Sequence, residues 1–208
     1  MELAPDLIVR DTRELDEMYG EPLERSVRKQ ISRIDDLARA FIAASPMVVI
    51  GTEADGTADV SPRGDAPGFV QVADDHTLLI PDRRGNNRLD SLRNLVKNPR
   101  VGLLFLVPGV AETFRVNGEA VLSRDPALTS RFEVQGKVPK TVIVVTVKEA
   151  YVHCSRALVR SDLWNPEKYP PKGTVPSFGT MLEAHTKGFV EANQVDEDAK
   201  VRVPLTLY

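Results

Sequence analysis

Apolar residues recur at intervals of three and four along the first part of the chain and predict helical structure there. The recurring positions are Leu23, Val27, Ile31, Ile34, Leu37 and Phe41. In an α-helix this spacing places the side chains on one face. Ser45-Pro46 ends the pattern, because a residue that precedes proline is disfavoured in the helical conformation. We therefore expect a helical N-terminal extension over residues 1–45.

Beyond this extension the pattern changes to short apolar runs and to alternation, which are typical of β-strands. Strands are expected at residues 47–52, 57–60, 69–72, 77–80, 103–107, 112–122 and 141–147. The glycines and prolines of SPRGDAPG, residues 61–68, predict a loop. Short helices are expected at residues 88–96 and from Asp125-Pro126 toward Phe132. Many short strands with few long helices between them favour a closed antiparallel barrel over a doubly wound parallel sheet.

The sequence after Trp164 is irregular, with prolines at positions 166, 170, 171 and 176. A last helix is expected over residues 181–193. The chain is therefore divided into the N-terminal extension, a β-barrel over residues 46–164 and a C-terminal Pro-rich and helical extension of the same domain over residues 165–208.

Composition narrows the possible functions. The 208 residues are 42% hydrophobic and 27% charged, with a formal net charge of -3, so nothing draws the whole chain to nucleic acid or anionic membranes, and an anion site must be built locally. A single cysteine, Cys154, and three widely spaced histidines predict neither an internal disulfide nor a metal site. The N-terminus lacks the apolar segment of a signal peptide, and no stretch approaches the ~20 apolar residues of a membrane helix. A cytoplasmic location is the expectation.

The clearest candidate for chemistry is the basic, turn-rich segment IPDRRGNNR, residues 80–88, between a predicted strand and a predicted helix. Backbone amides at a helix N-terminus together with a guanidinium group make a site for phosphate. Asn86 or Asn87 is expected to cap the helix or donate an amide hydrogen bond, and Arg88 to make a bidentate contact. A solvated loop with an asparagine cap explains the local pattern equally well.

Two further segments carry candidate residues. Arg63, in SPRGD, is a second cation for the same phosphate if the barrel brings the segments together; the alternative is a surface arginine beside a turn. Arg156 and Trp164 follow the last strand and offer a flat aromatic ligand a polar edge and a packing face. The alternative is a tryptophan buried in a strand-to-helix corner. Hydrolase, zinc-protease, P-loop and Rossmann motifs are absent, and no side chain stands out as a general acid or base, so no catalytic residue is predicted.

Taken in order, these segments resemble the pyridoxamine 5′-phosphate oxidase-like FMN-binding family, in a bacterial branch with a helical N-terminal extension. The resemblance runs from Tyr19 to about Trp164. It is carried by SPRGDAPGFV (61–70), LLIPDRRGNNRLDSLRNLVKNPRVGLLFLVPG (78–109), ETFRVNG (112–118) and HCSRALVRSDLW (153–164).

This resemblance implies a mainly β (α+β) fold, a split antiparallel β-barrel with peripheral helices, which forms a homodimer and holds FMN at the subunit interface. Arg63, Asn86, Asn87 and Arg88 would grip the phosphate. The backbone near Ile80, Pro81 and Asp82 would line the ribityl chain or the isoalloxazine. Thr113 would take the place of a flavin-contacting glutamine, and Arg156 would reach the flavin from the partner subunit.

The chain departs from the oxidases themselves in three places. GNNR stands where they carry an SRK-type helix start, HCSRALVRSDLW where they carry Trp-x-Ser-Arg-Pro, and VRVPLTLY shows no basic C-terminal segment. These departures argue against pyridoxamine phosphate oxidation. The predicted function is an FMN-dependent oxidoreductase acting on an unidentified small molecule. The alternative is a non-catalytic flavin, haem or deazaflavin binding protein on the same barrel, with His153 as the reason to consider haem.

Overall fold

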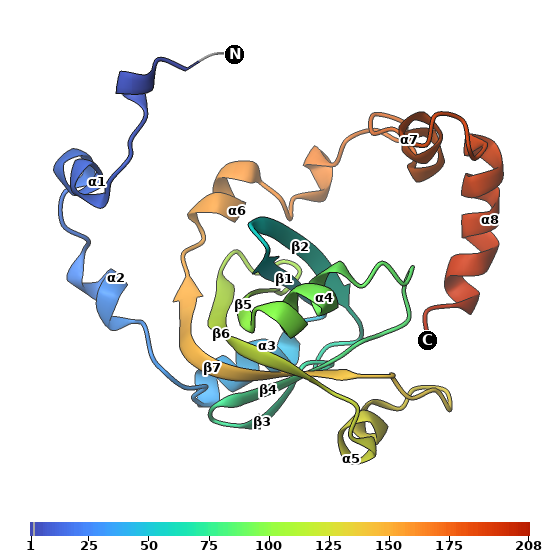
Figure 1. The fold of residues 1–208 in the computed structure, drawn as a ribbon, viewed down its shortest axis with the longest axis horizontal. Coiled ribbons are helices and arrows are strands. Elements are labelled where there is room, and N and C mark those ends of the chain that lie inside the picture. Colours follow the sequence, from blue (N-terminus) through green and yellow to red (C-terminus); the bar gives the residue numbers. More distant parts are fainter. Residues whose placement is uncertain (2) are drawn as a thin grey trace.

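The computed structural model describes Met1 and residues 3–208, and its centre is a seven-stranded antiparallel sheet curled into a split barrel (Figure 1). The strands are β1 (Met47–Ala54), β2 (Thr57–Gly64), β3 (Gln71–Asp74), β4 (Thr77–Pro81), β5 (Arg100–Leu106), β6 (Thr113–Ser123) and β7 (Val142–His153). Their order in the sheet is β2-β1-β5-β6-β7-β4-β3, so β2 and β3 are the two edges. The expected fold class is confirmed.

Alternating burial shows which face of each strand points inward. In β1, Val48, Ile50 and Thr52 are buried, while the residues between them are more exposed. Asp55 and Gly56 join β1 to β2, with φ angles of 53° and 75°. Two successive positive φ angles are what a two-residue hairpin turn requires, since the twist of that turn matches the twist of the strands.

One hydrophobic core lies inside the barrel and is closed by helix α3 (Asp36–Ala44). The Asp35 carboxylate caps this helix by accepting a hydrogen bond from the Ala38 amide at 2.8 Å. Ile42 is fully buried in the same cluster as Val48 and Phe105. Full burial of such a side chain contributes about 1.5–3 kcal/mol, so packing rather than helical propensity holds α3 in place.

The remaining helices near the barrel are short. They are α4 (Asp90–Lys97), α5 (Pro126–Thr129) with η2 (Ser130–Phe132), α6 (Arg156–Ser161) and η3 (Pro166–Lys168). Helix α4 packs on the inner side of β1 and β2, where Ser91 donates a hydrogen bond to Asp59 at 2.7 Å and Asn94 donates one to Thr52 at 3.2 Å.

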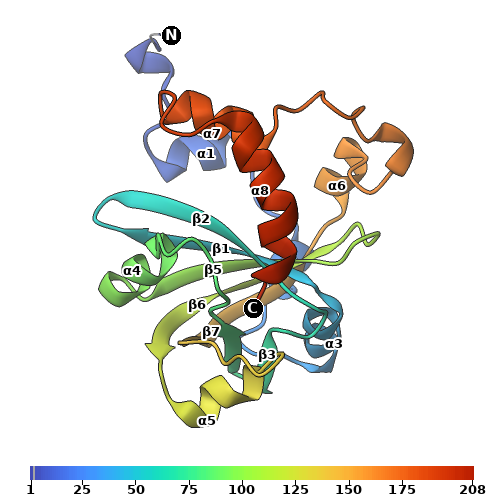
Figure 2. The ribbon, with the colours of Figure 1, turned by 90° about the vertical axis from the view of Figure 1, so that its right-hand side faces the viewer.

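Two helical arms stand away from the barrel on opposite sides, as Figures 1 and 2 show. The N-terminal arm contains η1 (Pro5–Leu7), α1 (Thr12–Tyr19) and α2 (Glu24–Arg28), and the C-terminal arm contains α7 (Phe178–His185) and α8 (Ala192–Leu205). Only Gly179 is buried in these arm helices among the residues that the structure describes. No helix in the described chain is both long enough and apolar enough to cross a membrane.

The structure corrects three predictions of secondary structure. The single apolar helical stripe does not form: Ile31 makes a β-bridge with Ala150, and Leu37 is 82% exposed. The expected loop at residues 61–68 is half strand, because β2 continues to Gly64. Proline is tolerated in an edge strand, so Pro62 does not stop β2. The single helix expected at residues 181–193 is two helices, α7 and α8.

Candidate cofactor site

Four charged residues meet where β2 and β4 end, at the split of the barrel, and we call them the split cluster: Arg63, Asp65, Asp82 and Arg83. Arg63 Nη1 donates to Asp82 Oδ1 at 2.8 Å, and Arg83 Nε donates to Asp65 Oδ2 at 2.7 Å. The end of β2 thus contributes Arg63 and Asp65, the end of β4 contributes Asp82 and Arg83, and each arginine pairs with the carboxylate of the other strand end. The sequence prediction that the barrel brings Arg63 close to the segment after β4 agrees with this geometry, although Arg63 lies in a strand and not in a loop.

The split cluster is largely shielded from solvent. The side chains of Arg63 and Asp82 are 20% and 16% exposed, and those of Arg83 and Asp65 are 17% and 5% exposed. Burial tends to raise the pKa of Asp65, but hydrogen bonds from Tyr208, the Ala66 amide and Arg83 outweigh it and hold this pKa below its usual value. Asp65 is therefore a carboxylate at neutral pH, which matches the charge of Arg83.

Two buried polar atoms beside Asp82 have no hydrogen-bond partner among the described residues: Arg63 Nε and Thr141 Oγ1. Thr141 is next to Asp82 because its carbonyl accepts from the Asp82 amide at 3.0 Å. Buried polar groups in native proteins are nearly always paired, so these two atoms are groups that a polar ligand or an ordered water would satisfy. Sequence reasoning missed Thr141, since a threonine at the start of a strand carries no local signal.

The turn before α4 has a different geometry from the one predicted. The helix begins at Asp90, with Leu89 in the left-handed region and no side-chain cap. Asn86 Oδ1 accepts a hydrogen bond from the Arg88 amide at 3.1 Å, so Asn86 stabilises the turn and does not cap the helix. Asn87 has a φ of 62°, and Arg88 is exposed with its Nε 2.6 Å from Asp90. All three predicted turn residues are accessible to a ligand from solvent.

Ile80 and Pro81 are buried in β4. Pairing with β3 covers β4 only from Thr77 to Leu79, whereas pairing with β7 continues to Pro81. Ile80 itself is a core side chain, so only its main chain is in a position to face a ligand, as the resemblance implied.

Thr113 lies on the other face of the sheet from Arg63. Phe114, Phe105, Val48 and Arg63 are direct neighbours across β6, β5, β1 and β2, and they share the inner face. Because side chains alternate along a strand, Thr113 points to the outer face. Arg156 begins α6, just after β7, and is exposed. One chain therefore does not bring Thr113 to the same side of the sheet as Arg63.

A second group of polar residues lies on that outer face, and we call it the outer-face cluster: Lys29, Arg115, Tyr151 and His153. The Tyr151 ring lies 5.4 Å from Lys29 Nζ and 5.2 Å from the Arg115 guanidinium carbon. Burial lowers the pKa of His153, and the charges of Arg115 and Lys29 lower it further, so the imidazole is neutral at pH 7. Its Nδ1 is buried and has no partner among the described residues. Sequence reasoning named His153 but missed the other three.

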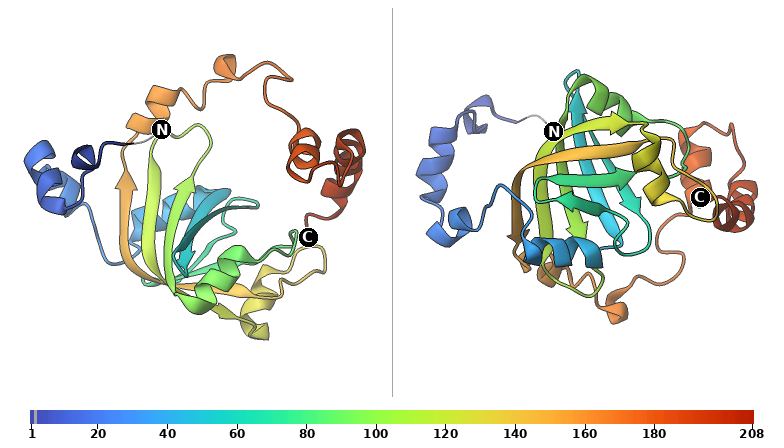
Figure 3. Two further views of the ribbon diagram at one scale, coloured as in Figure 1. Left: turned by 45° about the horizontal axis from the view of Figure 1, so that its top comes forward. Right: turned by 90° about the horizontal axis from the view of Figure 1, so that it is seen from below.

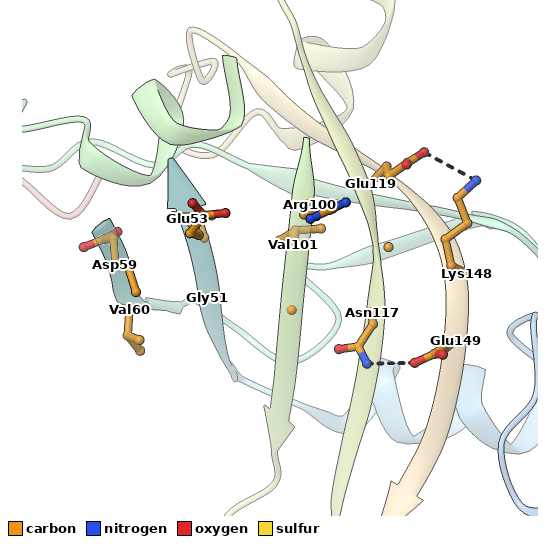
Figure 4. Close-up of a pocket in the computed structure, with 14 residues that line it drawn as sticks. Gly51, Glu53, Asp59, Val60, Arg100, Val101, Asn117, Glu119, Lys148 and Glu149 are labelled. Carbon is orange, nitrogen blue, oxygen red and sulfur yellow. Dashed lines mark hydrogen bonds and ion pairs between the residues drawn. The ribbon is translucent and has the colours of Figure 1, made fainter. Parts of the chain in front are cut away.

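A groove of about 560 Å³ crosses the same outer face (Figure 4). Gly51 and Gly102, which are paired on β1 and β5, line it, and Glu119–Lys148 and Asn117–Glu149 contacts lie along its other side. None of the nine predicted cofactor residues lines this groove. Trp164 also stays outside it: its indole donates to the Val110 carbonyl at 2.8 Å, which fits a tryptophan packed at a corner of the fold.

Within the described part of the chain, no three His, Cys, Asp or Glu side chains form a group that could hold a metal ion. The fold and the split cluster together define a split-barrel protein with a buried group of two arginines and two aspartates where β2 and β4 end. The chain belongs to the pyridoxamine 5′-phosphate oxidase family, whose sequence model matches residues 34–154. Membership of this family supports the binding of a flavin in general.

Several solved structures are similar at low identity. HupZ of Group A Streptococcus is 17% identical, with 57% of this chain and 93% of HupZ covered at a TM-score of 0.47. General stress protein 26 of Bacillus anthracis is 16% identical, with 54% and 88% covered at 0.41. The FAD binding protein of Mycobacterium smegmatis is 16% identical, with 59% and 97% covered at 0.41. No curated protein sequence matches the chain.

Proposed function

We propose that this chain binds FMN and acts as an FMN-dependent oxidoreductase on a small-molecule substrate. When bound, the flavin would supply the capacity to accept electrons from a donor and pass them on, and the protein would bind and orient it. The family supports a flavin; the choice of FMN follows the resemblance of the sequence, and the split cluster adds support for a ligand that carries a phosphate.

The observation that carries this proposal is the buried Arg63 Nε, which has no hydrogen-bond partner among the described residues. FMN ends in a phosphate, whose oxygens accept charge-assisted hydrogen bonds from a guanidinium group. Arg63 already uses Nη1 for Asp82, which fixes the direction of the guanidinium while leaving Nε to donate. Thr141 Oγ1 is the other buried group beside Asp82 that lacks a partner in the described part of the chain, and a hydroxyl can donate to the same anion. The residues present therefore fit a phosphate-bearing ligand.

The remaining predicted residues extend the site from this point. Asn86, Asn87 and Arg88 lie on the accessible turn that follows the split cluster, and in the proposal they close over the phosphate. The main chain at Ile80, Pro81 and Asp82 leads from the phosphate toward the ribityl chain.

We further propose that the complete site is formed by a homodimer, with FMN at the interface. Thr113 is on the opposite face of the sheet from Arg63, so a single chain cannot place both against one flavin. A second copy that presents its outer face to the split of the first would add the exposed Arg156 to the ligand, whereas Thr113, which is 3% exposed, would reach it only after the residues that cover it move. The family's members are commonly dimers, which agrees with this arrangement.

Ligand titrations test the phosphate contact directly. FMN fluorescence quenching is expected to show tighter binding of FMN than of riboflavin, which lacks the phosphate. Arg63→Ala should weaken FMN binding and leave riboflavin binding unchanged. Equal affinities of the wild-type protein for FMN and riboflavin would show that the protein does not bind the phosphate group. The absence of any flavin binding would contradict the whole proposal.

Mixed dimers test the interface. A heterodimer of Arg63→Ala and Arg156→Ala chains would hold one site with both wild-type residues and one site with neither, so it should bind about half the wild-type amount of FMN, whereas either homodimer should bind little. If the heterodimer bound no more FMN than the two variant homodimers, the shared site would be contradicted. A reductase and oxidase screen of the FMN-loaded protein with both nicotinamide donors then addresses the substrate.

A non-catalytic binding protein for haem or a deazaflavin is the second candidate, and His153 is the observation that favours it. Its imidazole is neutral, which is the form that ligates haem iron, and it is partly buried, with Nδ1 unpartnered in the described chain. A Soret band on haem addition that disappears in His153→Ala would support haem. Tight deazaflavin binding with FMN rejected would support the other alternative.

A further inference from the structure

The last residue of the C-terminal arm, Tyr208, returns to the barrel and contacts the split cluster, although helix α8 before it stands away. Tyr208 Oη donates to Asp65 Oδ1 at 2.7 Å, and its ring lies 5.2 Å from the guanidinium carbon of Arg83. The Tyr208 main-chain oxygen accepts a hydrogen bond from Lys137 Nζ at 2.8 Å. Figure 3 shows this end of the chain beside the loop after β4 and the loop after α5.

These contacts connect three segments that are far apart in the sequence. Asp65 follows β2, Arg83 follows β4, and Lys137 precedes β7. Arg83 Nη1 also donates to the Phe132 carbonyl at 2.6 Å, so the guanidinium contacts Asp65, Phe132 and the Tyr208 ring at once. Arg83 thus anchors the segment after β4 to the segments around Asp65, Phe132 and Tyr208.

Arg83 is the residue next to Asp82, and Asp82 holds Arg63. After Arg83 the chain enters the exposed turn at residues 84–89, which is not part of any helix or strand. A displacement of Arg83 would therefore move Asp82 and with it the direction of the Arg63 guanidinium. Small displacements of a binding group weaken a charge-assisted hydrogen bond because its strength depends on direction as well as distance.

We propose that Tyr208 is a positioning residue for the split cluster: it holds Asp65 and Arg83 together and thereby fixes Arg63 for the phosphate of the ligand. This inference rests on the FMN site proposed above. Since binding linkage is reciprocal, a ligand that holds Arg63 and the turn also stabilises the docked position of Tyr208. The docking of Tyr208 on the barrel and the binding of a ligand at Arg63 should therefore strengthen each other.

Two variants separate the contributions of the hydroxyl and the ring. Tyr208→Phe loses the hydrogen bond to Asp65 and keeps the ring over Arg83, whereas Tyr208→Ala loses both. Tyr208→Ala is expected to weaken FMN binding by about 5- to 150-fold, the range of typical coupling between sites, and Tyr208→Phe by less. Tyr169→Phe is the matched control, because Tyr169 is in the same C-terminal segment and is 57% exposed. Tyr208 lies outside the hydrophobic core, so all three variants should fold.

Hydrogen exchange of the flavin-free protein provides a readout that does not depend on FMN. Amides at residues 63–65 and 82–88 should exchange faster in Tyr208→Ala than in wild type, and at the wild-type rate in Tyr169→Phe. Unchanged exchange together with unchanged FMN affinity in Tyr208→Ala would overturn the positioning role while leaving the flavin site intact. If wild type binds no FMN but Tyr208→Ala still accelerates exchange, the flavin proposal falls and the anchoring by Tyr208 stands.

A spectroscopic signature checks the hydroxyl itself. The hydrogen bond to Asp65 raises the pKa of Tyr208 above its usual value of 10.0, and burial raises it further. Ultraviolet titration of the folded protein should show one tyrosine that ionises later than an exposed tyrosine does, and this component should be missing in Tyr208→Phe. A late component that persists in Tyr208→Phe would contradict the Tyr208–Asp65 contact.

Discussion

The split cluster and the outer-face cluster both gather cations near strand ends, but they differ in how the positive charge is balanced. In the split cluster each arginine has a carboxylate within 2.8 Å, and all four side chains are at most 20% exposed. In the outer-face cluster neither Lys29 nor Arg115 forms an ion pair with a carboxylate within the described residues, and both instead lie against Tyr151. The first cluster is electrostatically complete within one chain, and the second is not.

This difference indicates separate tasks for the two regions. A balanced and buried cluster holds its shape before any ligand arrives, which suits a site that must orient a phosphate. An unbalanced cluster on an open sheet face gains most when an anion or another protein surface covers it. Variants of the split cluster should therefore affect both stability and phosphate binding, whereas variants of the outer-face cluster should affect assembly or binding at the open face and leave stability nearly unchanged.

The largest effect is expected from Asp65→Ala. This change leaves the buried guanidinium of Arg83 without its carboxylate, and breaking a buried pair by removing one partner costs about 3–5 kcal/mol. Arg115→Ala is the matched change in the outer-face cluster and should alter the free energy of unfolding by less, because Arg115 is half-buried and its loss leaves no carboxylate unpaired among the described residues. Urea denaturation of both variants makes the comparison. Equal losses would show that the two clusters do not differ in the way described.

Arg63→Ala is expected to affect FMN binding next most strongly. Loss of a hydrogen bond from a charged donor is worth about 1.5–3 kcal/mol, which corresponds to a decrease in affinity of about 10- to 150-fold. Arg88→Ala should have a smaller effect, because Arg88 is exposed and hydrogen-bonded to Asp90. Isothermal titration with FMN measures both. A larger loss in Arg88→Ala would move the centre of the phosphate site from the split to the turn.

Gly118→Ala tests whether the close approach of β6 and β7 on the outer face requires a residue without a side chain. Gly118 adjoins a β-bulge between β6 and β7, and a Cβ atom built there would lie 2.2 Å from the Thr146 carbonyl oxygen. Forcing extra volume into such a contact costs about 1–3 kcal/mol. Gly102→Ala is the control, since its Cβ would meet Asn117 Oδ1 at an ordinary 3.6 Å. Thermal unfolding should therefore separate the two variants, with Gly102→Ala close to wild type.

The smallest effect concerns the pH dependence contributed by His153. The pKa of His153 in the folded protein is below its usual value of 6.5, so the unfolded chain binds more protons as the pH falls below 6.5. Stability should decrease in that direction and be regained as the pH rises. Because His153 is only partly buried, the change should be well under the roughly 1.4 kcal/mol of a one-unit shift. His153→Gln should therefore make the free energy of unfolding vary less with pH between 5 and 7, by well under about 1.4 kcal/mol. An unaltered slope would show that a group other than His153 causes the pH dependence.

The fold was predictable because its signals are local. Alternation along β6 and the Asp125-Pro126 helix start at α5 appear in the structure as predicted. Several element boundaries were wrong, two of them for reasons outside the local pattern: β2 passes through Pro62 because it is an edge strand, and α4 starts late because Leu89 adopts a left-handed conformation. The division of the chain at residues 45 and 164 stays a prediction.

The site was predictable only in part. Arg63 and the turn at residues 86–88 stood out because charge and turn residues are adjacent in the sequence. Tyr208 contacts Asp65 across 143 residues, and Lys29 reaches Val152 across 123, so no short pattern connects them. The separation of Thr113 from Arg63 follows from strand register, which depends on the pairing of four strands and cannot be read from one of them.

Pro62 has a consequence for the protein in a crowded solution. The open edge of a sheet is a template on which another extended chain can add, and long open edges promote fibril growth. Proline carries no N–H group, and it places a gap in the row of donors that β2 would offer to an incoming strand. Pro62, which the sequence pattern suggested would end the strand, thus makes edge-to-edge association through β2 less favourable, and it directly precedes Arg63.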